Sequence, residues 1–151
     1  MIITFVGHSL IPSGDQVKEA VKNNLRANVP PSEKLTCYVG GYGDFDRLCA
    51  IACRELKAEG INMEVLYVTP YLDSYAGDKI AEMRSLGLCD GSVYPPIENT
   101  PARFAISARN KWMVSGSDLI IAYVKYSHGG AYSSLCVAKR RKKRIINIAD
   151  L

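Results

Sequence analysis

Short apolar runs and amphipathic stretches alternate along the whole chain, and this alternation constrains the fold more than any other sequence feature. It predicts a parallel sheet whose strands are joined by crossover helices. The predicted strands are residues 2–6, 35–39, 63–68, 118–124 and 144–148, with a short sixth at 91–94. The predicted helices are residues 15–26, 45–59, 75–86, 103–115 and 131–141.

Several predicted strands consist almost entirely of Val, Ile, Leu and Tyr, as expected when helices cover both faces of a sheet. We therefore expect a Rossmann-like α/β fold, a three-layer α/β/α sandwich with a mostly parallel central sheet. A length of 151 residues fits one domain that spans residues 1–151.

The composition, with 48% hydrophobic and 23% charged residues, is that of an ordinary soluble protein. No apolar run approaches the roughly 20 residues that span a bilayer, and residues 1–6 lack a basic signal region. We expect a cytoplasmic protein with no membrane partner.

The five cysteines are odd in number and sit mostly in apolar runs, which favours buried thiols over disulfides or metal ligands. Neither a metal nor a cofactor is expected.

The net charge of +4 depends on one basic run, residues 139–144, because the rest of the chain has 13 basic and 15 acidic residues. The run ends a predicted helix, where cations offset the negative end of the helix dipole. We favour this interpretation over contact with nucleic acid phosphates, so nucleic acid is not an expected partner.

Ligands of such sheets bind at the carboxyl ends of the strands, so the strand-to-helix turns are the places to search. After the first strand come Gly7, which permits close backbone approach, and His8, which is either a hydrogen-bonding group or an incidental surface residue. After the second strand, residues 40–43 (Gly-Gly-Tyr-Gly) are able to direct amides at a phosphate. Asp46 then binds a ribose hydroxyl or caps its helix.

A second Gly-Gly turn, Gly129-Gly130-Ala131, follows the fifth predicted strand, and we expect both turns to face one crevice. Arg109 suits a bidentate contact to phosphate, with a salt bridge to Glu98 as the alternative. Arg103, six residues earlier, is expected to point in a similar direction. The expected ligand-binding residues are Gly7, His8, Gly40, Gly41, Tyr42, Gly43, Asp46, Arg109, Asn110, Gly129, Gly130 and Ala131.

Taken together, these turns resemble the small stand-alone members of the SLOG superfamily, of bacterial or prophage type. The resemblance covers nearly the whole chain and rests on residues 7–8, 39–46, 94–95, 103–106, 109–114, 117–118, 129–131 and 145–147. The superfamily groups the DNA-processing protein DprA with the Lonely Guy phosphoribohydrolases and with nucleotide-sensing domains. The resemblance implies a Rossmann-like fold that binds a nucleotide between the Gly-rich turns, and a homo-oligomer, which is common among relatives.

Lonely Guy enzymes cleave the N-glycosidic bond of nucleoside monophosphates, and the chain fits their motifs only in part. Arg109 and Met113 match the R-K-x-x-M pattern, whereas Cys136 stands where the PGGxGTxxE motif has its glutamate. Cleavage through an oxocarbenium-like state normally requires a carboxylate, which a thiol does not replace. Asp44, Asp46 and Glu98 are the remaining candidates.

Three hypotheses follow, and no catalytic residue is assigned. The preferred one is the binding or sensing of a nucleotide or nucleotide-derived small molecule. The alternative is a nucleoside monophosphate phosphoribohydrolase or another N-glycosidase. The third is an accessory protein that binds single-stranded DNA.

Overall fold

The structure is a computed structural model that describes residues 1–30 and 32–150. Six strands form one sheet in which every pair of neighbours is parallel. The strands are β1 (Ile2–Gly7), β2 (Leu35–Val39), β3 (Met63–Val68), β4 (Gly91–Val93), β5 (Leu119–Tyr123) and β6 (Arg144–Asn147). The helices are α1 (Gly14–Asn28), α2 (Gly43–Ala58), α3 (Ser74–Ser85), α4 (Ala105–Ser115) and α5 (Gly130–Arg140), with 3-10 turns at Ala102–Phe104 and Ile148–Asp150.

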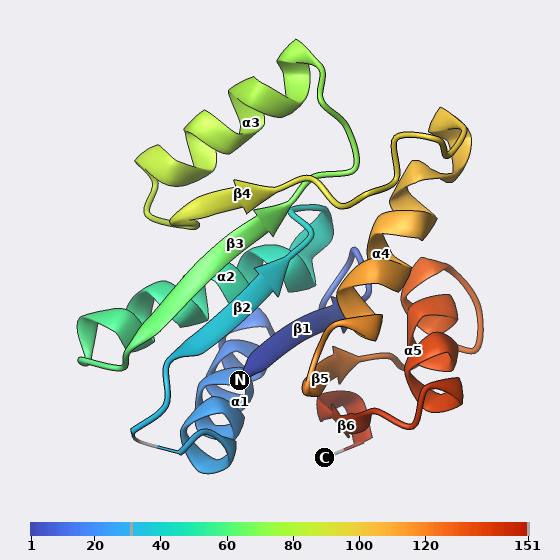
Figure 1. The fold of residues 1–151 in the computed structure, drawn as a ribbon. Helices are drawn as coiled ribbons and strands as arrows, with labels where there is room; N and C mark the ends of the chain where they lie inside the picture. The colour runs from blue at the N-terminus through green and yellow to red at the C-terminus, as the bar shows by residue number, and fades with distance from the viewer. Residues whose placement is uncertain (31, 151) are drawn as a thin grey trace.

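The strand order β4-β3-β2-β1-β5-β6 reverses direction at β1 (Figure 1). The chain runs outward from β1 to β4, crosses back through α4 to β5, and ends at the opposite edge with β6. Helices α1 and α2 pack together on one face of the sheet, and α4 and α5 on the other (Figure 1). This confirms the predicted three-layer Rossmann-like sandwich. The reversal places a crevice beside the carboxyl end of β1.

The central strands divide the apolar side chains between two cores because successive residues of a strand point to opposite faces. Ile3 and Phe5 of β1 belong to the core under α1 and α2, whereas Val6 belongs to the core under α4 and α5. All of β5 is buried, as its continuous apolar sequence predicts. The one hydroxyl in this part of β1, on Thr4, is buried and donates to the backbone oxygen of Met113 at 3.2 Å.

The predicted elements agree with the structure to within two residues, and the start of α4 is one of the places where they differ by two. The predicted helix 103–115 starts as a 3-10 turn, and α4 itself begins at Ala105 after Phe104, whose backbone is not helical. Gly60 closes α2 with a φ of 95°, as its position predicts. Four of the five free cysteines are buried and Cys136 is half-buried, which confirms the interpretation as structural thiols.

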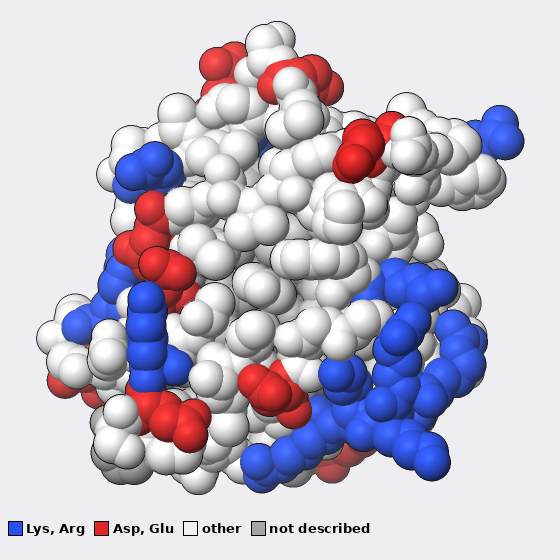
Figure 2. Space-filling view, viewed as in Figure 1, with Lys and Arg blue, Asp and Glu red and all other residues white. Residues whose placement is uncertain are grey.

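The charged side chains are unevenly distributed. Figure 2 shows Lys and Arg gathered over the end of α5 and the start of β6, at the lower right, while the front of the sheet is largely uncharged. Among the described residues, no helix combines the length and apolar character needed to cross a membrane. The same residues contain no group of three or more His, Cys, Asp or Glu side chains that would hold a metal ion.

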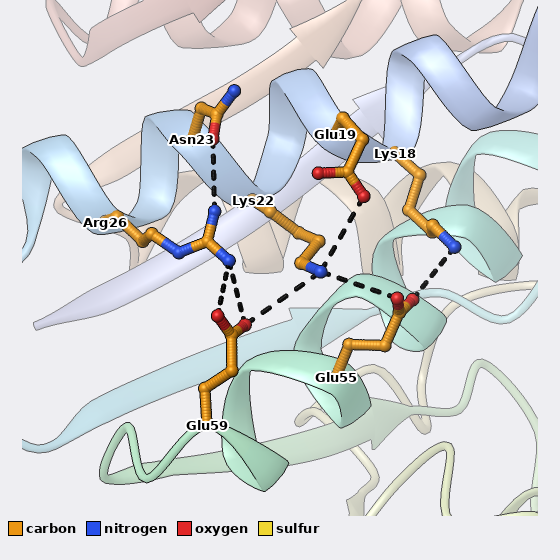
Figure 3. A network of polar contacts seen from close by, with 7 residues as sticks. All are labelled: Lys18, Glu19, Lys22, Asn23, Arg26, Glu55 and Glu59. Atoms are coloured by element: carbon orange, nitrogen blue, oxygen red, sulfur yellow. Dashed lines mark hydrogen bonds and ion pairs between the residues drawn. The ribbon is translucent and has the colours of Figure 1, made fainter.

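An ion-pair network joins α1 to α2 (Figure 3). Lys22 is 8% exposed, and its Nζ lies 3.4 Å from Oε1 of Glu55 and 3.9 Å from Oε2 of Glu59. Arg26 donates two hydrogen bonds to the Glu59 carboxylate, at 2.6 and 2.8 Å. Because the buried cation has carboxylate partners on the facing helix, the network fixes how α1 lies against α2.

Candidate functional site: a crevice at the carboxyl edge of the sheet

A crevice of about 610 Å³ opens at the carboxyl ends of β1 and β2 and beside the end of β5. Its walls come from the β1–α1 loop, the β2–α2 turn, the first half of α4 and the β5–α5 turn. These segments are distant in the sequence and meet because the sheet order reverses here. The volume lies within the range typical of small-molecule sites.

Eleven of the twelve residues expected from the sequence line this crevice, and the twelfth, Gly41, faces a neighbouring cavity of about 360 Å³ between α2 and α3. Arg103 does not line the crevice: it is exposed beside Phe104, so it does not share the direction of Arg109. The eleven are Gly7, His8, Gly40, Tyr42, Gly43, Asp46, Arg109, Asn110, Gly129, Gly130 and Ala131.

The glycines of the β2–α2 turn are packed against protein atoms. Gly41 has a φ of +75°, and a Cβ there would lie 2.2 Å from the ring of Tyr67. Gly43 has a φ of +85°, and its Cβ would lie 2.7 Å from the Cα of Ser9. These positions require glycine because the backbone is left-handed and the neighbours are close. Their need for glycine is therefore explained without a ligand.

Amides of the same turn are also occupied. The N–H of Tyr42 donates to Oδ2 of Asp46 at 3.1 Å, and the N–H of Asp44 donates to the carbonyl of Ser9 at 2.9 Å. Asp46 thus takes the place that a phosphate would have in this turn. Of residues 40–43, Tyr42 therefore has an amide that is already bonded to protein and is not free for a ligand anion.

The β5–α5 turn, by contrast, is open. A Cβ added at Gly129 or Gly130 would meet no atom within 4 Å. Helix α5 begins here at Gly130. The first helical hydrogen bond is donated by the N–H of Ser133 to the carbonyl of Gly129 at 3.0 Å. The N–H groups of residues 130–132 have no acceptor among the described residues, as is normal at a helix start. A helix start with free N–H groups and the positive end of the helix dipole is suited to an anion.

Arg109 is 2% exposed and ties the ends of two strands together. Its Nη1 donates to the carbonyls of Gly40 and Val68, each at 2.8 Å, and its Nε donates to Oδ1 of Asn110 at 2.8 Å. Burial lowers the pKa of Arg109, and the charge of Asp46 opposes this effect. Within the described part of the chain Nη2 has no hydrogen-bond partner, and Arg109 is one of the residues that line the crevice.

Asp46 is half-buried, and burial raises the pKa of its carboxyl to about 6. The hydrogen bond from Tyr42 and the positive charges of Arg109 and Lys79 lower this pKa and only partly offset the burial. The group therefore changes charge near neutral pH and is able to accept or donate a hydrogen bond to a ligand.

Asp46 is also the one carboxylate of the three candidates that lines the crevice. Oδ2 of Asp44 instead accepts a hydrogen bond from the Ile11 N–H at 3.2 Å, and Glu98 is exposed after β4. Cys136 lies on α5 outside the crevice lining.

His8 supports the open turn rather than standing alone on the surface. Its Nε2 accepts the backbone N–H groups of Lys125 and Tyr126, at 2.8 and 3.3 Å. Burial lowers the pKa of His8, and the nearby His128 lowers it further. A neutral ring with its proton on Nδ1 is therefore the form that holds the β5–α5 loop.

An aromatic rim, which the sequence interpretation missed apart from His8 and Tyr42, surrounds the crevice: His8, Tyr42, Tyr126 and His128. The rings of Tyr126 and His128 stack with their centroids 5.8 Å apart, and the centroids of the Tyr126 and His8 rings are 5.1 Å apart. Tyr126 is 57% exposed. The aromatic side chains on either side of Ser127, just before the Gly-Gly turn, were the available sequence signal.

Comparison with known proteins shows a similarity of fold but no similarity of sequence family. No protein-family model and no curated protein matches the sequence. The fold is similar to that of DNA processing protein A from Helicobacter pylori, with a TM-score of 0.58 over 96% of this chain and 17% sequence identity. The chain covers 63% of that protein, which is described as binding single-stranded DNA.

This similarity corrects one expectation. Nucleic acid was not expected as a partner, because the basic run was interpreted as the end of a helix. That expectation is wrong as it stands, since a protein of the same fold is described by its mode of binding single-stranded DNA.

Proposed function

We propose that this chain is a member of the SLOG superfamily that binds single-stranded DNA and seats one nucleotide unit of the strand in the crevice. The observation that supports this most is the open β5–α5 turn beside an exposed aromatic rim. A single strand offers both a phosphate and an unstacked base, and the crevice has a partner for each.

The phosphate is assigned to the start of α5, where the N–H groups of residues 130–132 lack protein acceptors. Nη2 of Arg109 supplies the charged contact on the opposite side of the crevice. The base stacks on Tyr126, which is an exposed ring of the rim that borders this turn. Asp46 is not assigned to the phosphate, because an ionised carboxylate repels phosphate. It binds a sugar hydroxyl or a base edge.

The test is a titration of labelled oligothymidylate, about 15 nucleotides long, followed by fluorescence anisotropy. Binding is expected to weaken steeply between about 50 and 200 mM salt. Tyr126→Ala is expected to lower the affinity about 5- to 160-fold, because a stacked base contributes about 1–3 kcal/mol. Tyr75→Ala is the matched control, since Tyr75 is 67% exposed but lies outside the crevice. The proposal fails if the wild-type chain shows no salt-sensitive binding.

A second candidate is a free nucleotide or nucleotide-derived molecule as the ligand, and the crevice volume of about 610 Å³ favours it. A ligand that binds the folded state raises the melting temperature. If mononucleotides do so at low concentration while oligothymidylate neither binds nor competes, the small-molecule function replaces the DNA-binding one. Chromatography of the same mixtures detects free base, which an N-glycosidase acting through Asp46 would release.

A further inference from the structure

The end of α5 opposite the crevice has a cluster of positive charge without ion-pair partners. Five of the six side chains are exposed and the sixth, Lys143, is half-exposed. Among the described residues none of the six forms a salt bridge, although the cations of α1 pair with Glu55 and Glu59. We call this cluster the basic surface, and it is seen at the lower right of Figure 2. Its residues are Lys139, Arg140, Arg141, Lys142, Lys143 and Arg144.

The helix dipole accounts for only part of this cluster. Its effect falls off within the last turn of a helix, and α5 ends at Arg140. Lys139 and Arg140 are therefore favourably placed, whereas residues 141–144 lie beyond the helix, where like charges repel one another. Of these four, Arg144 donates a hydrogen bond to Oδ1 of Asn28, which is a neutral partner. A surface of this kind fits a polyanionic partner.

Lys142 adds an independent observation. Its φ is 56°, in the left-handed region, and its N–H donates to the carbonyl of Lys139 at 3.1 Å as the chain leaves α5. Glycine is the residue favoured at this position of a helix end, because it has no Cβ. The chain thus keeps a cation where a neutral residue would make the fold more stable.

The apolar neighbours of the basic surface face inward. Val137 and Ile145 flank it, and both pack against the core under α4 and α5. Among the described residues of this segment no large apolar side chain is exposed, so there is no anchor of the kind that helices use at a membrane surface. Nucleic acid phosphates, which need charge alone, fit better.

Helix α5 connects the basic surface to the crevice. Its 11 residues span about 16 Å, which corresponds to at most about five phosphates, because the spacing of about 3.4 Å per strand is that of stacked duplex DNA and an unstacked single strand is longer per phosphate. We propose that the basic surface is a second contact for the DNA strand: it binds backbone phosphates within about five nucleotides of the unit seated in the crevice. This inference rests on the proposed function and adds a direction and a minimum length to it.

The experiment compares a long and a short oligothymidylate, about 15 and about 2 nucleotides, because only the long one reaches both contacts. The test variant is Lys139→Gln/Arg140→Gln/Arg141→Gln. The control variant is Lys34→Gln/Lys57→Gln/Arg84→Gln, which lowers the net charge equally at other places. Each phosphate contact on a single strand adds about 0.7 to the slope of log affinity against log salt. The test variant is expected to lower that slope by about 2 for the long strand alone.

A single substitution separates binding from folding. Lys142→Gly is expected to raise the melting temperature by about 2–4 °C, because it relieves the left-handed backbone, and yet to weaken binding of the long strand. An effect of the same size in both triple variants, or equal losses for both strand lengths, overturns the inference while the crevice function stands. Absence of any binding by the wild-type chain overturns both.

Discussion

Arg109 belongs to the framework of the site as well as to its lining. The carbonyls of Gly40 and Val68 both accept hydrogen bonds from this one buried guanidinium nitrogen, so its loss leaves two acceptors unpaired. Arg109→Leu is expected to lower the free energy of unfolding by about 2–4 kcal/mol, measured by urea denaturation. Arg103→Leu, on an exposed residue, is the control and is expected to change it by less than about 0.5 kcal/mol. Equal stability of the two variants would contradict this assignment.

Asp46 is expected to make the free energy of unfolding depend on pH with a sign opposite to that of a carboxylate whose pKa is lowered by folding. Burial raises its pKa to about 6 from the model-compound value of 3.8, so between these limits the folded state binds the proton more tightly than the unfolded state. The contribution of Asp46 to stability is therefore greatest at low pH and is lost as the pH rises through about 6.

Urea denaturation of the wild type and of Asp46→Asn at several pH values tests this. The stability of the wild type relative to the variant is expected to fall between about pH 4 and pH 6 and to level off above. The Asn side chain keeps an acceptor for the Tyr42 N–H, so the comparison isolates the charge. If the difference in stability between the two proteins does not change with pH, the pKa of the Asp46 carboxyl is not shifted.

At the scale of the element, the two adjacent glycines at the start of α5 have different roles: Gly129 is needed for the backbone conformation and Gly130 for access to the amides. Gly129 has a φ of 90° and a ψ of 178°, a conformation that is close to glycine-only. Gly130 is the first helical residue and lacks a positive φ. Gly129→Ala is therefore expected to lower the free energy of unfolding by about 1–3 kcal/mol.

Gly130→Ala is expected to leave stability within about 0.5 kcal/mol, because its Cβ would lie in open space. The same methyl group lies beside the amides assigned to the phosphate, so the affinity for oligothymidylate is expected to fall. Denaturation and anisotropy on the two variants check this pair. Unchanged binding by Gly130→Ala would remove the phosphate from this turn.

At the scale of the whole molecule, stability is unevenly spread between the helices of one layer. Helix α2 buries six residues in its core, whereas α3 buries only Ala76 and Met83 and lies at the β4 edge (Figure 1). Amides of α3 are expected to exchange with solvent deuterium at least about tenfold faster than those of α2, because less burial has to be lost when α3 opens. Equal protection of the two helices in hydrogen-exchange mass spectrometry would contradict this.

The sequence by itself determined the order and type of the elements, because apolar periodicity and turn residues are local properties of the chain. The all-parallel sheet then followed from the alternation of strands and helices, and the crevice from the rule that ligands bind at carboxyl ends. This is why residues as distant as Gly7, Arg109 and Gly130 were expected together and do line one cavity.

Only the tertiary structure decided which of the two Gly-Gly turns is open. The turn at 40–43 is filled by Tyr67 and Ser9, and nothing in the local sequence shows that these side chains and backbone atoms approach it. The pKa of Asp46 depends likewise on neighbours that the fold brings near, and so does the lack of ion-pair partners for residues 139–144 within the part of the chain that the structure describes. Burial and charge pairing are set by contacts between distant segments, so a single sequence without its fold does not determine them.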